Sequence, residues 1–186
     1  MQHSETLPPR RWAAKPRKVS GMLMASLWLT SMVAVPTPAL AVDGCLVLLC
    51  FAAPNWRAIP QCVPPIQQVL RDLARGRPFP TCAAAGPGNT ASHQWAAAPS
   101  YCPPQYTRPV DNESGVQYTC DYTGAVSVMI EGSLWARTWW NRGGNSVTEY
   151  TPAAKARLGS WETRFDDDYA AWLATLPAPA PSCFSC

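Results

Sequence analysis

The chain ends in a Cys-x-x-Cys sequence, Cys183-Phe184-Ser185-Cys186. Two cysteines at this spacing form the redox pair of disulfide oxidoreductases, and paired cysteines also bind zinc. A redox pair, however, has its first cysteine at a helix N-terminus, where the helix dipole lowers the pKa of the thiol. Here the pair follows a tail rich in Pro and Ala, and an oxidising compartment disfavours free thiolates. A structural disulfide, either local or to the body of the protein, is therefore favoured.

Two groups of carboxylates could in principle bind a metal ion or catalyse glycoside hydrolysis. The run Asp166–Asp168 offers the hard oxygen ligands that calcium prefers. Consecutive residues of a helix point around its axis, so a solvated helix face is favoured over a metal site. Glu131, Glu149 and Glu162 offer the two carboxylates that a glycosidase needs. Because the sequence alone gives no separation between these side chains, the glycosidase remains an alternative.

A histidine-dependent nucleophile would have to use His93, the one histidine after residue 41. His93 lies in a stretch rich in Ala, Ser and Gly, where an exposed loop histidine is expected. The sequence has neither the nucleophile elbow of serine hydrolases nor a phosphate-binding glycine loop. We therefore assign no catalytic residue, no cofactor and no metal ligand, and the balance favours a protein that is not an enzyme.

Three tryptophans, Trp135, Trp139 and Trp140, lie on one expected strand. Alternation places Trp135 and Trp139 on one face of the strand and Trp140 on the other. Two interpretations stay open for them. They either pack in the core against an aromatic helix near the C-terminus, which is favoured, or form a surface that binds a partner.

The first 41 residues have the features of a signal peptide. A basic flank precedes Met22–Ala41, which has no charged residue and ends in Ala-Leu-Ala. Small residues at these positions suit signal peptidase, so we expect cleavage after Ala41. A retained transmembrane anchor is the alternative, but Pro36 and Pro38 shorten the apolar helix. Without this leader the chain holds 10 Lys and Arg against 11 Asp and Glu, so no basic footprint for nucleic acid remains.

All eight cysteines follow the expected cleavage site. An even number of cysteines in a small exported domain indicates disulfides, although their connectivity cannot be deduced from the sequence. The disulfide candidates are Cys45, Cys50, Cys62, Cys82, Cys102, Cys120, Cys183 and Cys186.

Hydrophobic periodicity predicts short elements around these cysteines. An apolar run at 43–50 is compatible with either a helical turn or a strand. The apolar residues of 63–75 recur at helical spacing after two prolines, which predicts a short amphipathic helix. Strand patterns follow at 116–122, 125–130, 134–140 and 146–150 and suggest an antiparallel meander. A helix is expected from Thr151 to Leu176, and Gly159 leaves open a division into two helices.

These patterns predict an α+β fold, a small disulfide-stabilised domain with short N-terminal helices, a small antiparallel sheet and a C-terminal amphipathic helix. The chain divides into a signal peptide (1–41), a disulfide-stapled helical segment (42–82), a loop or linker (83–109), a sheet with the C-terminal helix (110–176) and a Pro/Ala tail ending in Cys-x-x-Cys (177–186).

Residues 43–82 resemble the TrbM/KikA group of conjugal transfer proteins. The resemblance rests on the opener Cys45-Leu-Val-Leu-Leu-Cys50 directly after a signal peptide, the step Ala58-Ile-Pro-Gln-Cys62, and a short helix leading into Arg77-Pro-Phe-Pro-Thr-Cys82. It implies an exported component of the mating-pair-formation apparatus, without an established catalytic activity.

The expected function is therefore a non-catalytic accessory component of a conjugative type IV secretion system, located in the periplasm or secreted. Its expected partners are envelope proteins of that apparatus, with no nucleic acid, and with the membrane only through the transient signal segment. One alternative is a cell-envelope enzyme, either a peptidoglycan glycosidase or a thiol–disulfide oxidoreductase. A secreted disulfide-rich toxin or inhibitor is the second alternative.

Overall fold

Two short helices joined by disulfides form the first part of the fold. The computed structural model describes residues 42–177, which fall within one compact unit. Helix α1 spans Gly44–Ala52. Asp43 is its N-cap residue, and the Asp43 carboxylate accepts a hydrogen bond from the Cys45 backbone N–H at 2.8 Å. A 3₁₀ turn, η1 (Trp56–Ala58), leads to α2, Val63–Ala74. The run at 43–50, left open between helix and strand, is thus helical.

Helix α2 has the amphipathic face that its spacing predicts. Ile66, Val69, Leu70 and Leu73 are buried, and proline near its start suits a first turn whose N–H groups lack helical partners. The disulfide Cys50–Cys62 ties α1 to the residue that precedes α2, and Cys45–Cys82 ties the start of α1 to the chain beyond α2.

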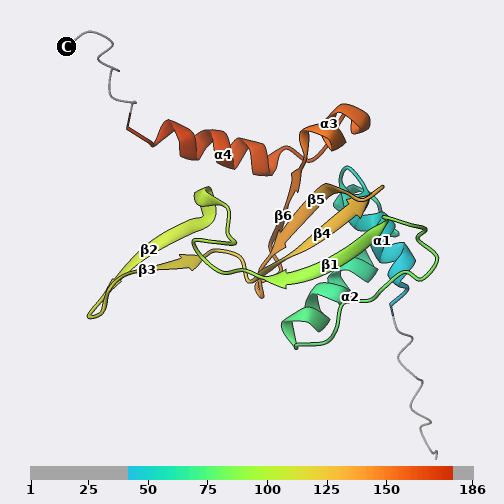
Figure 1. Ribbon diagram of the computed structural model, residues 1–186, viewed down its shortest axis with the longest axis horizontal. Coiled ribbons are helices and arrows are strands. Elements are labelled where there is room, and N and C mark those ends of the chain that lie inside the picture. Colours follow the sequence, from blue (N-terminus) through green and yellow to red (C-terminus); the bar gives the residue numbers. More distant parts are fainter. Residues whose placement is uncertain (1–41, 178–186) are drawn as a thin grey trace, which may run out of the picture. The chain divides into compact units, whose positions relative to one another are not determined.

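A four-stranded antiparallel sheet in the order β1-β4-β5-β6 forms the centre of the fold (Figure 1). Its strands are β1 (Thr90–Trp95), β4 (Gly124–Ile130), β5 (Ser133–Trp140) and β6 (Ser146–Tyr150). Because side chains alternate along a strand, each face of the sheet has its own core.

The core on one face joins the sheet to the N-terminal helices. Val126, Val128 and Trp140 pack there with the buried residues of α1 and α2. On the other face, Ala125, Trp139 and Val147 pack with Tyr106 and Tyr122. Both faces of the central strands are therefore covered.

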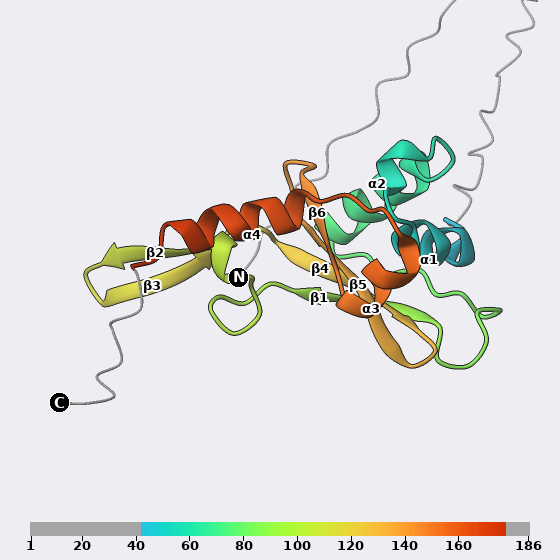
Figure 2. The same cartoon turned by 90° about the horizontal axis from the view of Figure 1, so that it is seen from above.

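A separate two-stranded hairpin extends away from this sheet (Figure 2). It consists of β2 (Thr107–Asn112) and β3 (Gly115–Cys120), and most of its side chains are exposed. The short 3₁₀ turn η2 (Pro104–Tyr106) precedes it, and the disulfide Cys102–Cys120 closes its base.

The C-terminal helix is divided in two. Helix α3 spans Pro152–Leu158, and the Thr151 hydroxyl oxygen accepts a hydrogen bond from the Ala154 backbone N–H at 3.2 Å. Gly159 then has a φ of 72°, a left-handed conformation that suits glycine and ends the helix. Helix α4 follows at Arg164–Ala174. This is the division that Gly159 had left open.

The α+β fold class predicted from the sequence is confirmed, with disulfides, short helices and an antiparallel sheet. The interpretation of 83–109 as a loop or linker is wrong for Thr90–Trp95, which forms the edge strand β1 and pairs with β4, and for residues 107–109, which begin β2. The sequence of β1, Thr-Ala-Ser-His-Gln-Trp, has no apolar alternation, and backbone hydrogen bonds to β4 make it a strand. Strand β3 likewise joins the hairpin with β2 and does not extend the meander.

Candidate functional site

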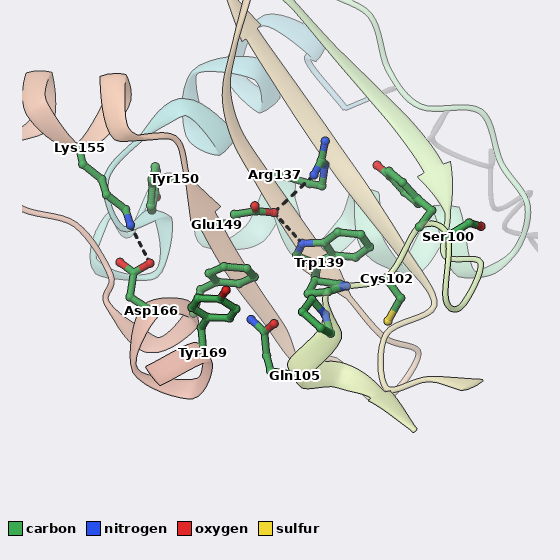
Figure 3. A pocket seen from close by; sticks show the side chains of 14 residues that line it. Ser100, Cys102, Gln105, Arg137, Trp139, Glu149, Tyr150, Lys155, Asp166 and Tyr169 are labelled. Carbon is green, nitrogen blue, oxygen red and sulfur yellow. Dashed lines mark hydrogen bonds and ion pairs between the residues drawn. The ribbon is translucent and has the colours of Figure 1, made fainter. Parts of the chain in front are cut away.

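A cavity of about 530 Å³ lies between the loop before η2, strands β5 and β6, and helices α3 and α4 (Figure 3). Such a volume is typical of sites for small molecules or short peptide segments. Its walls combine aromatic rings with side chains of both charge signs. Elements far apart in sequence meet here, because the loop at 100–105 and the start of α4 both lie against the same face of the sheet.

An ion pair between two neighbouring strands forms one wall of the cavity. Arg137 on β5 and Glu149 on β6 are direct partners in the strand register, so their side chains share a face. Arg137 Nη1 lies 3.4 Å from Glu149 Oε2, and the Trp139 indole Nε1–H donates to the same oxygen at 3.2 Å. The Glu149 carboxylate is thus held by a cation and a neutral donor.

A second ion pair connects α3 with α4. Lys155 Nζ lies 2.6 Å from Asp166 Oδ1, and the Trp161 indole Nε1–H donates to Asp166 Oδ2 at 2.9 Å. Both charged side chains line the cavity. The charges that face the cavity are therefore balanced pair by pair.

Aromatic rings form the rest of the lining. The centroids of Tyr101 and Trp139 lie 5.1 Å apart, and the guanidinium of Arg137 lies 5.3 Å from the Tyr101 ring centroid. Tyr169, on α4, is 40% exposed and stacks on Trp172 with centroids 5.6 Å apart. Flat apolar faces beside hydrogen-bonding groups suit a ligand with both apolar and polar parts.

Gln105 carries polar groups that the protein leaves unpaired. Its side chain lines the cavity and is labelled in Figure 3 between Tyr169 and Trp139. The residue is 4% exposed, and neither its Nε2 nor its Oε1 has a hydrogen-bond partner among the described residues. Buried amide groups without partners cost roughly 1–3 kcal/mol each. Both amide atoms have almost no accessible surface, so they are unpaired without being open to the cavity.

The position of Gln105 follows from its neighbours in sequence. Two prolines, Pro103 and Pro104, start η2, and Cys102 is fixed by its disulfide to Cys120. No hydrophobic pattern marks such a residue, so the sequence alone did not identify it.

Next to the cavity, two tyrosines and a carboxylate form a buried cluster. The Tyr106 hydroxyl donates to Asp168 Oδ2 at 2.6 Å. Burial, and then this hydrogen bond, raise the pKa of Tyr106 far above its usual value, and burial also raises the pKa of Tyr122. Both phenols are therefore protonated at neutral pH. Tyr106 thus acts as a fixed hydrogen-bond donor to Asp168 at the base of the hairpin.

The carboxylates considered for chemistry do not converge. Glu131 pairs with Arg157 on the surface, and Glu162 pairs with Arg57, so of the three glutamates Glu149 alone lines the cavity. The glycosidase arrangement that the sequence left open is therefore not assembled from these three residues.

The three consecutive aspartates also contact different partners. Asp166 pairs with Lys155, Asp167 accepts from the Thr163 hydroxyl at 2.9 Å, and Asp168 accepts from Tyr106. Within residues 42–177 no group of three potential metal ligands is found.

Trp139 and Trp140 belong to the core, but only Trp139 packs near the C-terminal helix as the first interpretation expects, with Phe165, whereas Trp140 packs with the N-terminal helices. They are 2% and 0% exposed and lie in the separate cores on the two faces of the sheet. Trp135 is partly buried and donates from Nε1 to the Ala52 carbonyl at 3.0 Å. It packs on the same core as Trp140, against the predicted alternation. The cause is a bulge, since Val128 pairs with Ala136 and Met129 with Leu134, which leaves Trp135 as the extra residue.

His93 lies on β1, not in an exposed loop. Its ring meets Trp95 edge to face with centroids 4.8 Å apart, and its Nε2 is buried without a partner among the described residues. Burial lowers the pKa of His93, which favours the neutral ring. His93 lies outside the lining of the cavity.

Six of the eight candidate cysteines form the three disulfides described above. Cys183, Cys186 and the expected cleavage site at Ala41 lie outside the described residues. Disulfides fit an oxidising compartment. None of the described helices has the length and apolar character needed to cross a membrane.

Comparison with known proteins identifies no relative of this chain. No family model, no curated protein and no solved structure matches the chain.

Proposed function

We propose that this protein is a non-catalytic, exported component of a conjugative type IV secretion apparatus, and that its cavity binds a segment of an envelope partner. The resemblance of residues 43–82 to the TrbM/KikA group supports the choice of apparatus. The disulfides Cys45–Cys82 and Cys50–Cys62, which enclose that segment, support a location outside the cytoplasm.

The pairing of the charges in the cavity is the observation that carries a binding role. Glu149 and Asp166 each contact a cation and an indole N–H, so both carboxylates are engaged. A general acid or base needs a proton to exchange with a substrate, and a carboxylate held in this way serves better to position neighbours.

Conjugal transfer tests the role. Deletion of the gene in a cell that carries the conjugative element is expected to lower transfer frequency by several orders of magnitude, with recovery when the full chain is supplied in trans. The same chain without residues 1–41 is expected to give no recovery. Unchanged transfer after deletion would overturn the proposal.

A matched pair of variants tests the cavity. Tyr169→Ala removes a ring that is 40% exposed from the cavity wall, while Tyr118→Ala removes a ring that is 50% exposed from the hairpin strand β3. Both variants are expected to fold, with melting temperatures close to that of the unmodified protein. Transfer should fall about tenfold or more with Tyr169→Ala alone, as for a truncated aromatic contact at an interface. Equal transfer by the two variants would remove the cavity from the proposal.

A direct assay separates this role from that of an envelope enzyme. Turnover of cell-wall glycan by the purified protein, lost on Glu149→Gln, would replace the binding role by a catalytic one. We expect no turnover from either form.

A further inference from the structure

A second hollow, the arginine groove, lies apart from the cavity described above. It has a volume of about 710 Å³ and runs between one face of α2 and the turn 141–144 that joins β5 to β6. Trp56 and Arg57 of η1 line it between these walls. The groove shares no lining residue with the first cavity, so a ligand bound in it is independent of the proposed function.

The charges that line the groove are all of one sign. Four arginines contribute to it, and none of its lining residues is acidic. This is unusual in a folded part that carries almost no net charge. The lining arginines are Arg57, Arg71, Arg75 and Arg142.

Arg57 already has partners and serves as a fixed part of the wall. Its guanidinium contacts Glu162 at 3.3 Å, donates to the Ser146 carbonyl at 2.7 Å, and lies 4.5 Å from the centroid of the Trp56 ring. Burial lowers its pKa, yet an arginine with a carboxylate partner stays charged at neutral pH.

The other three arginines keep most of their donors free. Arg71 donates to the Gln68 side-chain oxygen at 2.9 Å, and Arg75 lies 3.7 Å from Asp72, a carboxylate that is closer to Arg77 at 3.0 Å. Arg142, in the turn, makes no ion pair or side-chain hydrogen bond with any residue between 42 and 177. Each guanidinium can therefore present a pair of N–H groups to a ligand.

The inner part of the groove is apolar. Val63, Leu70 and Ala74 line it from α2. Trp56 is 4% exposed, and its indole Nε1–H is enclosed by the protein without a partner among the described residues. The donors that the groove offers to a ligand are therefore those of the arginines.

We infer that the arginine groove binds a phosphate group carried on a larger organic molecule. A phosphate monoester has up to two negative charges and three acceptor oxygens, which matches three guanidinium groups better than the single charge and two oxygens of a carboxylate. The apolar inner wall and the volume leave room for the molecule that carries the phosphate. Within an envelope the source is either a soluble phosphate monoester or a lipid whose headgroup is a phosphate monoester, such as phosphatidic acid.

Chemical-shift titration of the oxidised full chain tests the site. Inorganic phosphate and glycerol 3-phosphate are the probes, and acetate at equal ionic strength is the control, since salt screens exposed charges. Saturable shifts of amides in α2, η1 and the turn 141–144 are expected with phosphate and not with acetate. Equal binding of acetate or of an acidic peptide would overturn the phosphate assignment, and so would the absence of saturation.

Variants of exposed arginines make the test specific. Arg71→Gln and Arg142→Gln should each weaken phosphate binding about tenfold or more, the usual effect of losing a charge-assisted hydrogen bond. Arg142→Lys keeps the charge and loses the planar guanidinium. Its affinity for phosphate should therefore lie between those of the unmodified protein and Arg142→Gln. Arg108→Gln is the control, because this exposed arginine pairs with Asp121 on the hairpin. An equal loss with Arg108→Gln would show unspecific attraction and overturn the site.

Vesicles distinguish the two sources of phosphate. Co-sedimentation with phosphatidic acid vesicles, absent with phosphatidylcholine and reduced in Arg142→Gln, assigns the groove to a lipid headgroup. Saturable binding of glycerol 3-phosphate without vesicle binding assigns it to a soluble ester. Each result supports a phosphate site, and failure of both probes overturns it. Neither outcome bears on transfer, so the phosphate site and the proposed function fail separately.

Discussion

At the scale of single residues, four side chains have buried polar atoms without hydrogen-bond partners within residues 42–177, namely Trp56, His93, Gln105 and Trp140. Of these, His93 packs against the rings of Trp95 and Trp140, and Gln105 lines the first cavity. Polar groups buried in this way lower the stability of the fold, and they are retained where they do something else.

Replacement of Gln105 by methionine tests how much the unpaired amide costs in stability. Gln105→Met keeps an unbranched side chain of similar length and removes both unpaired amide atoms. The free energy of unfolding should rise by about 1 kcal/mol or more, because the cost of the unsatisfied amide disappears. Urea unfolding measures this change. A loss of stability of the same size would show that the amide has a partner in solution, such as a bound water.

The stability of the protein should depend on pH through His93. Gly124 allows the imidazole to lie close, since a Cβ at Gly124 would stand 2.6 Å from His93 Nε2. Burial lowers the pKa of His93 in the folded protein, so the unfolded chain binds the proton more readily. This contribution to stability is complete above the ordinary histidine pKa of about 6.5 and falls as the pH drops below it, towards the lowered folded value.

Urea midpoints at pH 7.5 and pH 5 measure the effect, and His93→Gln is the comparison. The unmodified protein should lose more stability on acidification than the variant, which cannot take up this proton. Equal losses in the two proteins would contradict the assignment of the pH dependence to His93.

At the scale of elements, the β2–β3 hairpin depends on one covalent link. A two-stranded sheet is marginally stable alone, and this one leaves Val110, Val116 and Tyr118 exposed. The disulfide Cys102–Cys120 fastens its base to the loop that positions Gln105. The hairpin and the first cavity are therefore coupled through this link.

Removal of that disulfide should release the hairpin and leave the sheet intact. In the double variant Cys102→Ala, Cys120→Ala, backbone amides of β2 and β3 should exchange with solvent many times faster. Amides of β4 and β5, buried between two cores, should keep their protection. Hydrogen exchange followed by NMR measures both groups in one sample. Loss of protection in β4 and β5 as well would show that the hairpin link supports the whole fold.

At the scale of the whole molecule, disulfides link segments that are distant in sequence. Cys45–Cys82 closes a loop with a sequence separation of 37 residues and Cys50–Cys62 one of 12, and the two together enclose α1 and α2. A closed loop restricts the unfolded chain, by about 2–4 kcal/mol for each disulfide. These disulfides stabilise a domain whose hydrophobic core is divided between the two faces of a small sheet.

Intact mass spectrometry tests this covalent frame. Alkylation before and after reduction should show at least the six cysteines of the three disulfides protected in the native protein, and reduction should lower the melting temperature. Fewer than six protected cysteines would contradict the disulfide-stapled fold.

Much of the fold is predictable because local physics decides it. Two prolines and an apolar stripe specify α2, Gly159 separates α3 from α4, and alternation marks β4, β5 and β6. Strand β1 escapes prediction, because an edge segment without apolar alternation becomes a strand only when β4 offers backbone partners.

The candidate sites belong to the tertiary structure. The sequence by itself determined the cysteine-rich α+β character and the charge balance of residues 42–186. It did not determine that Gln105 meets β5, β6 and α4, or that α2 faces the turn at Arg142. These contacts depend on strand register, on the bulge at Trp135 and on the cysteine pairing, each of which joins residues far apart in the chain. A single sequence records the types of residues along the chain, whereas a site requires their distances in space.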